Sequence, residues 1–335
     1  MKGIAQGGAV RRSFKGSAQS GTVPRSLHNA AGGDAPRCAS RAVAFVLAGG
    51  LLLALGACAT RAPAPLSHER IAEIVAAPDR SAADRTNDLR RKPVEMLEFI
   101  GIRPGMIALD LSAGGGYTTE LLARGVGPNG RVYGQSAPRD PSRAGPAAAE
   151  GAAMPAAAGA TGSARPADAS APPAVAAALM PRASAPPRTS AMALAARAQK
   201  PAAANIVAVT QRFEAPVPAG LATNGLDLVT LMFNYHDLGH MGVDRAQMNA
   251  AVFHALKPGG SYVIADHAGR PGTGISESGT LHRIEEAFLR REVEAAGFRL
   301  AAEGSFLRNP GDPRDMNTPN PPQPKDEFVL KFVKP

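Results

Sequence analysis

Short apolar runs and helix-like periodic segments alternate along most of residues 67–335, and this alternation predicts the fold class. Five runs are rich in apolar residues, as expected for strands buried on both faces of a sheet: 107–111, 132–134, 205–209, 226–233 and 261–268. Periodic segments predict helices at 117–124, 244–256 and 281–296. Strands that alternate with helices predict a mostly parallel sheet with helices on both faces.

The two ends of this region extend the pattern. Ser67 is a suitable N-cap for a helix, and Val94, Leu97 and Ile100 recur at three-residue spacing in a helix expected over 92–100. The end of the chain predicts two more strands, at 298–307 and 328–333, with no helical pattern between them. We therefore expect a seven-stranded sheet whose last strand is antiparallel.

The alternation stops after the second expected strand. Residues 137–200 contain 26 Ala and 10 Pro. Frequent proline opposes a long helix, and the lack of large apolar residues opposes a core. We expect residues 140–187 to form a disordered insertion in a surface connection, and residues 190–199 to form a helix.

The chain begins with a basic and then apolar leader. Arg37 and Arg41 precede sixteen uncharged residues, 42–57. A membrane-spanning helix needs about 20 apolar residues, so this run suits the apolar core of a secretory signal better. The alternative is a buried helix with an incidental cysteine, Cys58.

The end of the run, "LGAC", resembles the bacterial lipoprotein box. The resemblance implies that residues 1–58 are a leader, that Cys58 becomes the lipidated first residue, and that residues 59–66 are a linker. It also implies a membrane partner through the lipid on Cys58 and a location in the cell envelope, facing the periplasm. If the leader is not functional, the domain is expected in the cytoplasm.

The net charge of +9 lies mostly in this leader. Residues 1–57 hold seven of the 37 basic and one of the 28 acidic side chains, which leaves 30 basic and 27 acidic residues, or +3. The remainder has no basic stripe with interleaved aromatic residues, so we expect no nucleic-acid partner. Cys38 would leave with the leader, so no disulfide is expected.

Small residues follow the first expected strand, at the edge where open α/β sheets bind ligands. The segment "IALDLSAGGGYTTELLARG", residues 107–125, passes from Asp110 through Gly114 and Gly116 into a helix. A P-loop needs Gly-Lys-Ser/Thr, which is absent. A dinucleotide fingerprint needs a glycine where Thr119 stands, and Asp110 would repel a pyrophosphate. An aspartate beside bare backbone suits a cationic ligand.

The stretch "LDLSAGGG" resembles motif I of the class I S-adenosylmethionine-dependent methyltransferases, commonly Asp-x-Gly-x-Gly-x-Gly, with Ser112 in place of the first glycine. The resemblance covers residues 92–335 without the insertion and includes "LKPGG" before the fifth strand. It is closest to predicted bacterial methyltransferases with "FNYHD" and "ADH" after the fourth and fifth strands. It implies a Rossmann-like methyltransferase fold over residues 67–335 and S-adenosyl-L-methionine as the cofactor.

The resemblance also implies which residues bind the cofactor. The loop wraps the methionine part, and Asp110 helps to hold its ammonium group. The expected cofactor-binding residues are Asp110, Ser112, Gly114, Gly116, Tyr117, Ser136, Phe233 and Asn234. The sequence departs from the family where an acid often binds the ribose, since Gln135 and Ser136 stand there, and where an acid often binds the adenine amine, since Gln211 and Arg212 stand there.

The stretch "FNYHDLGH", residues 233–240, should face the same cleft. We expect Tyr235, His236 and Asp237 to be catalytic, with His236 taking a proton from the acceptor near neutral pH. In one alternative His236 and Asp237 only fix the loop by a hydrogen bond. In another, magnesium binds as in some O-methyltransferases, with Asn234, Asp237, Asp266 and His267 as ligands. The expected site contains no metal.

The best expectation for function is methyl transfer from S-adenosyl-L-methionine to a small-molecule acceptor. The rival is a non-catalytic methyltransferase-like domain that binds a ligand or partner as an envelope lipoprotein, which the uncharged ribose and adenine positions favour. A third class is a metal-dependent hydrolase built on the His and Asp residues. The charge-rich residues 79–91 are expected to form a solvated helix face, and His282 and Arg283 the exposed start of a helix.

Overall fold

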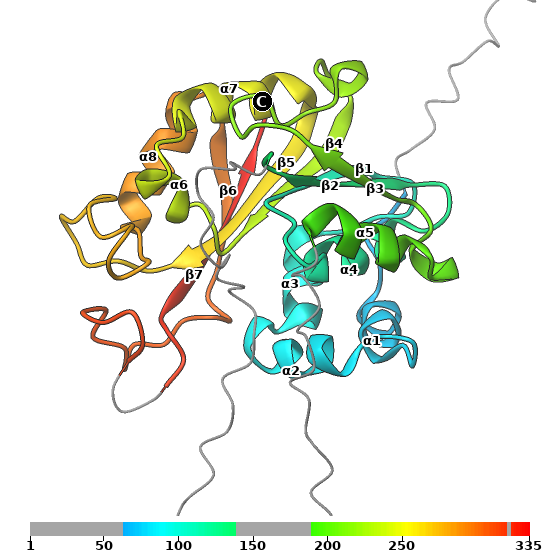
Figure 1. Ribbon diagram of the computed structural model, residues 1–335, viewed down its shortest axis with the longest axis horizontal. Helices are drawn as coiled ribbons and strands as arrows, with labels where there is room; N and C mark the ends of the chain where they lie inside the picture. Colours follow the sequence, from blue (N-terminus) through cyan, green and yellow to red (C-terminus); the bar gives the residue numbers. More distant parts are fainter. Residues whose placement is uncertain (1–62, 139–188, 320–322) are drawn as a thin grey trace, which may run out of the picture. The chain divides into compact units, whose positions relative to one another are not determined.

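The computed structural model of the protein describes residues 63–138, 189–319 and 323–335 (Figure 1). The leader, Cys58 and the insertion at 140–187 lie outside the described residues, so the expectations for them remain predictions. The chain divides into two units, Met1–Thr60 and Arg61–Pro335, and the description that follows concerns the second. Within the described part of the chain, every helix is too short or too polar to cross a membrane.

Seven strands form one sheet in the order β3-β2-β1-β4-β5-β7-β6. Strands β1 to β5 run parallel, and β7 is antiparallel to both β5 and β6. The strands are β1 (Ile107–Leu111), β2 (Arg131–Ser136), β3 (Ile206–Thr210), β4 (Leu226–Met232), β5 (Leu256–His267), β6 (Arg299–Gly304) and β7 (Glu327–Val333). This confirms the expected seven-stranded Rossmann-like methyltransferase fold, including its antiparallel strand.

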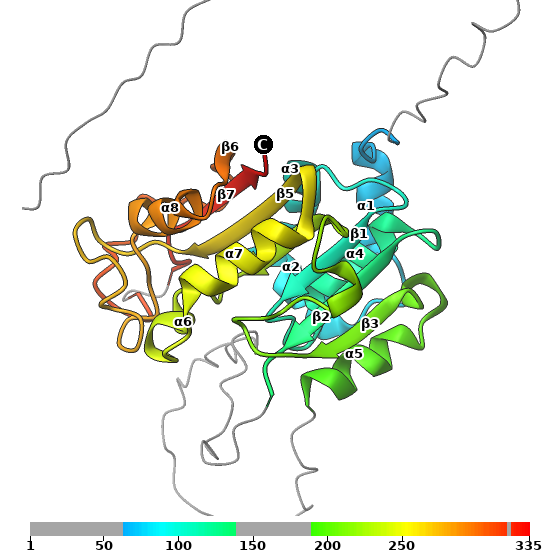
Figure 2. The same cartoon turned by 90° about the horizontal axis from the view of Figure 1, so that it is seen from above.

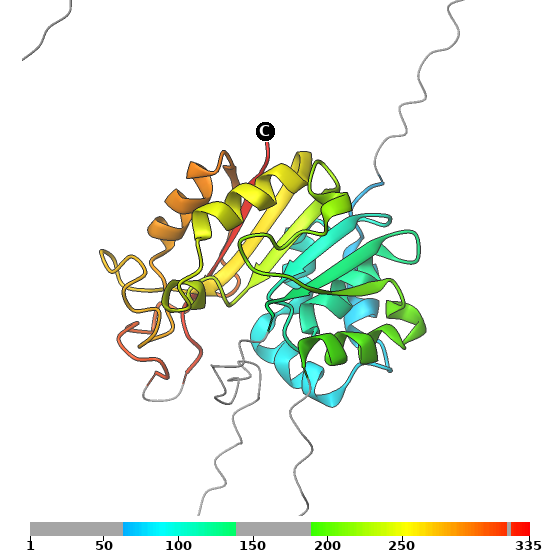
Figure 3. The same cartoon turned by 45° about the horizontal axis from the view of Figure 1, so that its top comes forward.

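Helices cover both faces of the sheet (Figures 2 and 3). Apolar side chains of α1, α3, α4 and α5 pack on one face, and those of α7 and α8 pack on the other. The helices are α1 (His68–Ala76), α2 (Ala82–Arg91), α3 (Pro93–Ile100), α4 (Tyr117–Val126), α5 (Ser190–Ala198), α6 (Asp237–His240), α7 (Arg245–Ala255) and α8 (Glu286–Ala295), with short 3-10 turns η1 (Pro201–Ala203) and η2 (Ala219–Leu221).

Local signals explain where several helices begin. The side chain of Ser67 accepts a hydrogen bond from the backbone N–H of Arg70 and caps α1, as expected. Asp244 caps α7 in the same way through the backbone N–H of Gln247. Alternate residues of a central strand serve different cores: Ala108 joins the core under α4, and Leu109 joins the core under α7. This two-sided burial explains why the strands read as continuous apolar runs.

The expectation for residues 281–285 is wrong. Helix α8 begins at Glu286, and the preceding residues instead pair with the end of β5, where the N–H of Ile284 donates to the carbonyl of His267 at 3.1 Å. Arg283 is fully buried, and its guanidinium donates to a carboxylate oxygen of Asp312 at 2.8 Å and to the carbonyl of Ala268 at 3.0 Å. A buried arginine needs such partners, and they fix this segment against the sheet.

The expected solvated face at 79–91 is also wrong in part. Arg80 is buried and donates to both oxygens of Asp88 at 2.7 Å. Asp84 is buried as well and receives two hydrogen bonds of 2.8 Å from Arg197 of α5. Helix α2 is therefore bound to the domain through its charged residues, and its last residues reach the carboxyl end of β4.

Candidate functional site

The bend between β1 and α4 is made of left-handed backbone. Ser112, Gly114 and Gly116 have φ values of 54°, 53° and 78°. A Cβ on Gly116 would lie 2.8 Å from the Cδ of Arg197 and 2.9 Å from a methyl carbon of Leu194. Both the positive φ and the close approach of α5 therefore require glycine at this position.

Side chains from two neighbouring elements, β2 and α5, hold this glycine bend, residues 110–117. The amide oxygen of Gln135 accepts from the backbone N–H of Ser112 at 3.0 Å, and its NH₂ group donates to the carbonyl of Gln211 at 2.6 Å. Arg197 donates from Nε to the carbonyl of Gly115 at 2.6 Å. Gln135, one candidate for binding the ribose, thus ties β1, β2 and β3 together, and the partly exposed Ser136 is left as the other candidate.

Asp110 lies just before the bend and is only 2% exposed. Its carboxylate accepts from Thr119 at 2.6 Å and from Thr230, its partner in the adjacent strand, at 2.7 Å. Burial raises the pKa of Asp110 to about 6, although the two hydroxyls and the nearby Arg91 favour the charged form. The two hydroxyls engage both oxygens of the carboxylate, and the backbone N–H of Thr119 also favours its charged form.

The last turn of α2 lies over Phe233, the residue that follows β4. The guanidinium carbons of Arg90 and Arg91 lie 5.0 and 4.7 Å from the centre of its ring, and Arg91 is also 5.3 Å from the ring of Tyr117. A small hollow, partly open to solvent, adjoins these groups. Its lining comprises Arg91, Pro93, Met96, Leu97, Ile100, Tyr117, Thr118, Leu121, Met232 and Phe233.

Arg91 differs from its neighbour because it forms no ion pair with the described residues. Arg90 forms an ion pair of 2.7 Å with Glu327. The side chain of Arg91 makes no hydrogen bond or ion pair with the described residues, and its Nε is buried. Burial and the adjacent Arg90 lower the pKa of Arg91 to about 10, so it remains charged at neutral pH. A partly buried guanidinium beside a hollow is suited to bind a carboxylate or phosphate.

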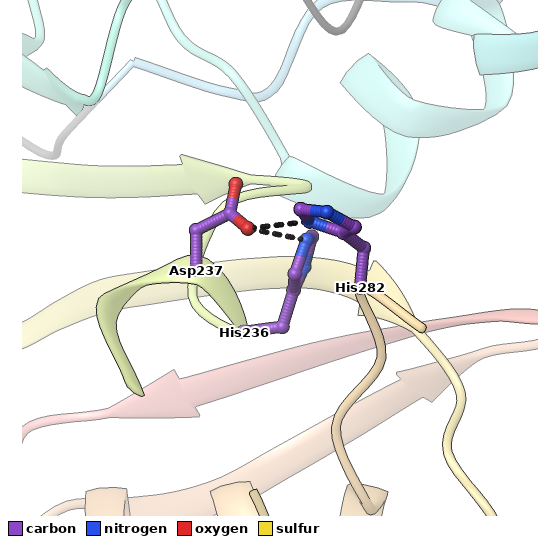
Figure 4. Close-up of side chains that lie close together, drawn as sticks. All are labelled: His236, Asp237 and His282. Carbon is purple, nitrogen blue, oxygen red and sulfur yellow. Dashed lines mark hydrogen bonds and ion pairs between the residues drawn. The ribbon is translucent and has the colours of Figure 1, made fainter. Parts of the chain in front are cut away.

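The ends of β4 and β5 and the loop before α8 together form a histidine–aspartate cluster, defined here as His236, Asp237, Asp266 and His282 (Figure 4 shows three of them). His236 Nδ1 lies 2.6 Å from Asp266 Oδ1, and its Nε2 lies 3.1 Å from Asp237 Oδ1. His282 Nδ1 is 2.8 Å from the same oxygen of Asp237. One carboxylate oxygen thus faces these two imidazoles closely, and a third imidazole, that of His240, has its Nδ1 3.8 Å from the same oxygen.

Charge stabilises this arrangement. Burial alone would lower the pKa of His236, but Asp266 and Asp237 outweigh it and raise the pKa to about 10. Burial opposes ionisation of Asp237, yet His236 and His282 lower its pKa to about 2. His236 therefore already carries its proton at neutral pH, and a protonated imidazole has no lone pair with which to accept another proton.

Two hydrogen bonds connect the glycine bend to the cluster. Ser112 Oγ donates to Asn234 Oδ1 at 2.6 Å, and Asn234 Nδ2 donates to Asp237 Oδ2 at 2.9 Å. The expected cofactor residues Ser112 and Asn234 and the expected catalytic residue Asp237 therefore form one continuous chain. The two motifs, which are more than 100 residues apart in sequence, meet at one edge of the sheet.

Tyr235 does not lie with these residues. Its ring is buried in the core under α7 and α8, and its hydroxyl accepts from Asn249 at 2.9 Å and donates to Glu292 at 3.0 Å. Phe233 and Tyr117, by contrast, both line the hollow. The Tyr117 hydroxyl donates to Asp88 at 2.7 Å, so this side chain also holds α2 in place.

The magnesium set of the alternative hypothesis does not converge either. His267 is buried with its Nδ1 3.0 Å from Glu327, and burial holds its pKa well below the usual value. Asp266 directs both oxygens at His236. In the described part of the chain, the acidic and histidine groups whose ligand atoms converge within 4.8 Å are His236, Asp237 and His282.

Two residues of the site were missed in the sequence. His282 was assigned to an exposed helix, yet it stands in left-handed backbone with a φ of 51° and its ring enters the cluster. Arg91 was assigned to a solvated face. No local pattern marks either residue, because each depends on how a distant segment packs. The adjacent arginines Arg90 and Arg91 at the end of α2 are the one hint that the sequence offers.

Comparisons with protein-family models and with curated protein sequences give no match. Among solved structures, the chain is similar to a SAM-dependent methyltransferase from Aquifex aeolicus, with 15% identity, a TM-score of 0.44, and coverage of 76% of this chain and 100% of that one. It is also similar to an arsenic(III) S-adenosylmethionine methyltransferase from Chlamydomonas reinhardtii, with 15% identity, a TM-score of 0.44, and coverage of 82% and 74%. Because identities and TM-scores are low, the function has to be inferred from the residues of the cleft.

Proposed function

We propose that the protein transfers a methyl group from S-adenosyl-L-methionine to a small-molecule acceptor bound beside the histidine–aspartate cluster. The observation that carries this proposal is the chain Ser112–Asn234–Asp237, which joins the bare bend to a charged cluster. A cofactor on the bend and an acceptor at the cluster would then be neighbours, as group transfer requires.

The charges of Asp110 and Arg91 suit the amino-acid end of this cofactor. The buried carboxylate of Asp110 offers a negative charge for the ammonium group, and Arg91 offers a positive charge for the carboxylate group. The charged form of Asp110 is favoured by Arg91, so the two side chains are close enough to interact. A zwitterionic amino acid would satisfy both charges at once.

The adenosine end has uncharged partners. Ser136 ends β2, where its hydroxyl can exchange hydrogen bonds with a ribose. Gln211 follows β3, and its Oε1 is buried and accepts no hydrogen bond from the described residues. This oxygen could accept a hydrogen bond from the adenine amine, because a buried acceptor without a hydrogen bond costs free energy.

The reaction would be an in-line displacement. A nucleophilic atom of the acceptor attacks the methyl carbon, the bond from that carbon to the sulfonium sulfur breaks, and S-adenosylhomocysteine leaves as a neutral thioether. Positioning supplies most of the acceleration. The carboxylates of Asp237 and Asp266 favour an acceptor that becomes more positive as it is methylated, or that releases a proton toward the cluster.

Calorimetric titration of the full chain with S-adenosylhomocysteine tests the proposal. We expect saturable binding that weakens at least tenfold in Asp110→Asn. Asp315→Asn, which changes an exposed aspartate in the same way, should bind like the wild type. Absence of binding at millimolar ligand would overturn the proposal and favour the rival, a non-catalytic domain. The rival is supported by Gln135, whose side chain is already hydrogen-bonded to backbone groups.

We further propose that Cys58 carries a lipid and anchors the domain in the cell envelope, as the "LGAC" box suggests. Metabolic labelling with a clickable palmitate analogue should mark the wild-type chain and not Cys58→Ser. The variant Cys38→Ser should be labelled like the wild type, because Cys58 is the proposed acceptor. Loss of labelling in Cys38→Ser would instead assign the lipid to Cys38. Equal labelling of wild type and Cys58→Ser would reject the anchor.

A further inference from the structure

We propose that the histidine–aspartate cluster is a binding site for a divalent transition-metal ion of the Zn²⁺ type, ligated by His236 Nε2, His282 Nδ1 and the carboxylate of Asp237. The site is distinct from the magnesium set suggested by the sequence. It includes His282, which lies on the separate loop before α8. Asp266 is not a ligand in this site but a hydrogen-bond partner of the ligand His236.

The spacing of the three ligand atoms fits such an ion. Both nitrogens lie 2.8–3.1 Å from Asp237 Oδ1, and all three atoms are within 4.8 Å of one another. In a tetrahedral site with bonds of about 2.0–2.1 Å, ligand atoms lie about 3.3–3.4 Å apart. Small shifts of these side chains therefore suffice to place an ion between them.

Each ligand is oriented by a group behind it. His236 Nδ1 is held by Asp266 at 2.6 Å, which directs Nε2 at the centre of the cluster. Asp237 Oδ2 accepts from Asn234 at 2.9 Å, which leaves Oδ1 for the centre. Carboxylate and amide partners of this kind are usual behind metal ligands, because they fix the imidazole tautomer and the ligand direction.

The third ligand, His282, stands on a fastened segment. Arg283 beside it is fully buried and bound to Asp312 and to the carbonyl of Met316 at 3.0 Å. Ile284 pairs with the end of β5. The left-handed φ of His282 is a strained conformation that this fastening imposes, and it turns the ring toward Asp237 (Figure 4). A site on a fixed frame loses little entropy when an ion binds.

Donor type and access indicate which ion fits and what it leaves open. Two imidazole nitrogens and one carboxylate favour Zn²⁺ or a related first-row ion over Mg²⁺, which prefers oxygen ligands. The side chain of His236 is fully buried, whereas those of Asp237 and His282 are 14% and 30% exposed, so the cluster is open on one side. Three protein ligands with one open position are typical of a catalytic rather than a structural zinc site.

An open position would give the ion a role in the chemistry. A hydroxyl or thiol bound there would lose its proton more readily. The acceptor class would then be a metal-coordinating hydroxyl or thiol compound. This consequence rests on the proposed methyl transfer, whereas the metal site itself does not.

Equilibrium dialysis of the chelator-stripped, tag-free full chain against Zn²⁺ tests the site. We expect one ion per chain with at least micromolar affinity, and at least a 100-fold loss of affinity in His282→Ala and in Asp237→Asn. His254→Ala removes an exposed histidine of α7 and should bind as the wild type does. No stoichiometric binding, or equal binding by wild type and His282→Ala, would overturn the proposal.

X-ray absorption spectroscopy of the Zn²⁺-loaded wild type guards against variants that fail to fold. We expect only nitrogen and oxygen atoms in the coordination shell of the ion, with two of the ligands being imidazoles. A shell with no imidazole, or with four, would contradict the assignment. The titration with S-adenosylhomocysteine is independent of this result. Zn²⁺ binding without nucleoside binding would reject the proposed function alone, and nucleoside binding without Zn²⁺ would reject the metal site alone.

Discussion

The glycine bend and the histidine–aspartate cluster lie at one edge of the sheet but are built in opposite ways. The bend is a single segment, residues 110–117, and its shape comes from backbone conformations that glycine permits. The cluster collects charged side chains from the ends of two strands and from a distant loop, and ion pairs hold it together. The bend is therefore defined by its backbone shape, and the cluster by its paired charges.

The largest expected effect is at Gly116, because the bend depends on its backbone. In Gly116→Val, left-handed strain and overlap with Arg197 and Leu194 each cost about 1–3 kcal/mol, so we expect S-adenosylhomocysteine to bind at least about 30-fold more weakly. Gly115→Ala is the matched control, since a Cβ there meets nothing within 4 Å. Calorimetry that finds the two variants equal would show that the shape of the bend is not what matters.

Arg91 separates recognition by charge from recognition by shape. In Arg91→Gln the carboxylate of S-adenosylhomocysteine loses a charged partner worth about 1.5–3 kcal/mol, so its dissociation constant should rise about 10- to 100-fold. Binding of 5′-methylthioadenosine, which has no amino-acid end, should not change. Equal weakening of both ligands in a competition titration would assign Arg91 to packing on Phe233 and Tyr117 instead.

The pH dependence of binding tests Asp110. With a pKa of about 6, the free carboxylate is mostly protonated at pH 5 and mostly ionised at pH 7. An ammonium group binds the ionised form, so affinity for S-adenosylhomocysteine should rise about tenfold between these two values. Asp110→Asn should show a flat profile over the same range. A wild-type affinity that falls with rising pH would contradict the role given to this residue.

The smallest expected effect on binding is at Tyr235, which shares a motif with the cluster but not its location. Tyr235→Phe removes the hydroxyl that joins Asn249 and Glu292, and we expect a loss of about 1–3 kcal/mol in the free energy of unfolding. The affinities for S-adenosylhomocysteine and Zn²⁺ should remain within twofold of wild type. A large loss of either affinity with unchanged denaturant stability would return Tyr235 to the site.

The same contrast explains how far the sequence predicts the molecule. Hydrophobic periodicity predicts the seven strands and their alternation with helices, and Ser67 and Asp244 predict where two helices begin. These signals are readable because they act over a few residues. The bend is predictable for the same reason, since aspartate and glycine stand within one short segment. Local chemistry is legible in the sequence wherever the partner of a residue is also local.

The remainder of the site depends on partners far away along the chain. His282 meets Asp237 across 45 residues, and Arg197 meets the carbonyl of Gly115 across 82. Arg283 looks like a surface residue until Asp312 is placed against it, since burial of a charge is tolerated only when a partner is present. For this reason the sequence predicts a solvated α2. It also predicts Tyr235 in the cleft, because neighbouring residues of one motif can point to opposite faces of the sheet.

A crystal structure of the full chain with S-adenosylhomocysteine would show whether the bend binds the cofactor. We expect the amino-acid end over the bend at Gly114, with its ammonium group beside Asp110 and its carboxylate within ion-pair distance of Arg91. The adenine should lie near Gln211. A ligand bound elsewhere, or a cleft that stays empty at saturating concentration, would contradict the claim that the bend is a cofactor site.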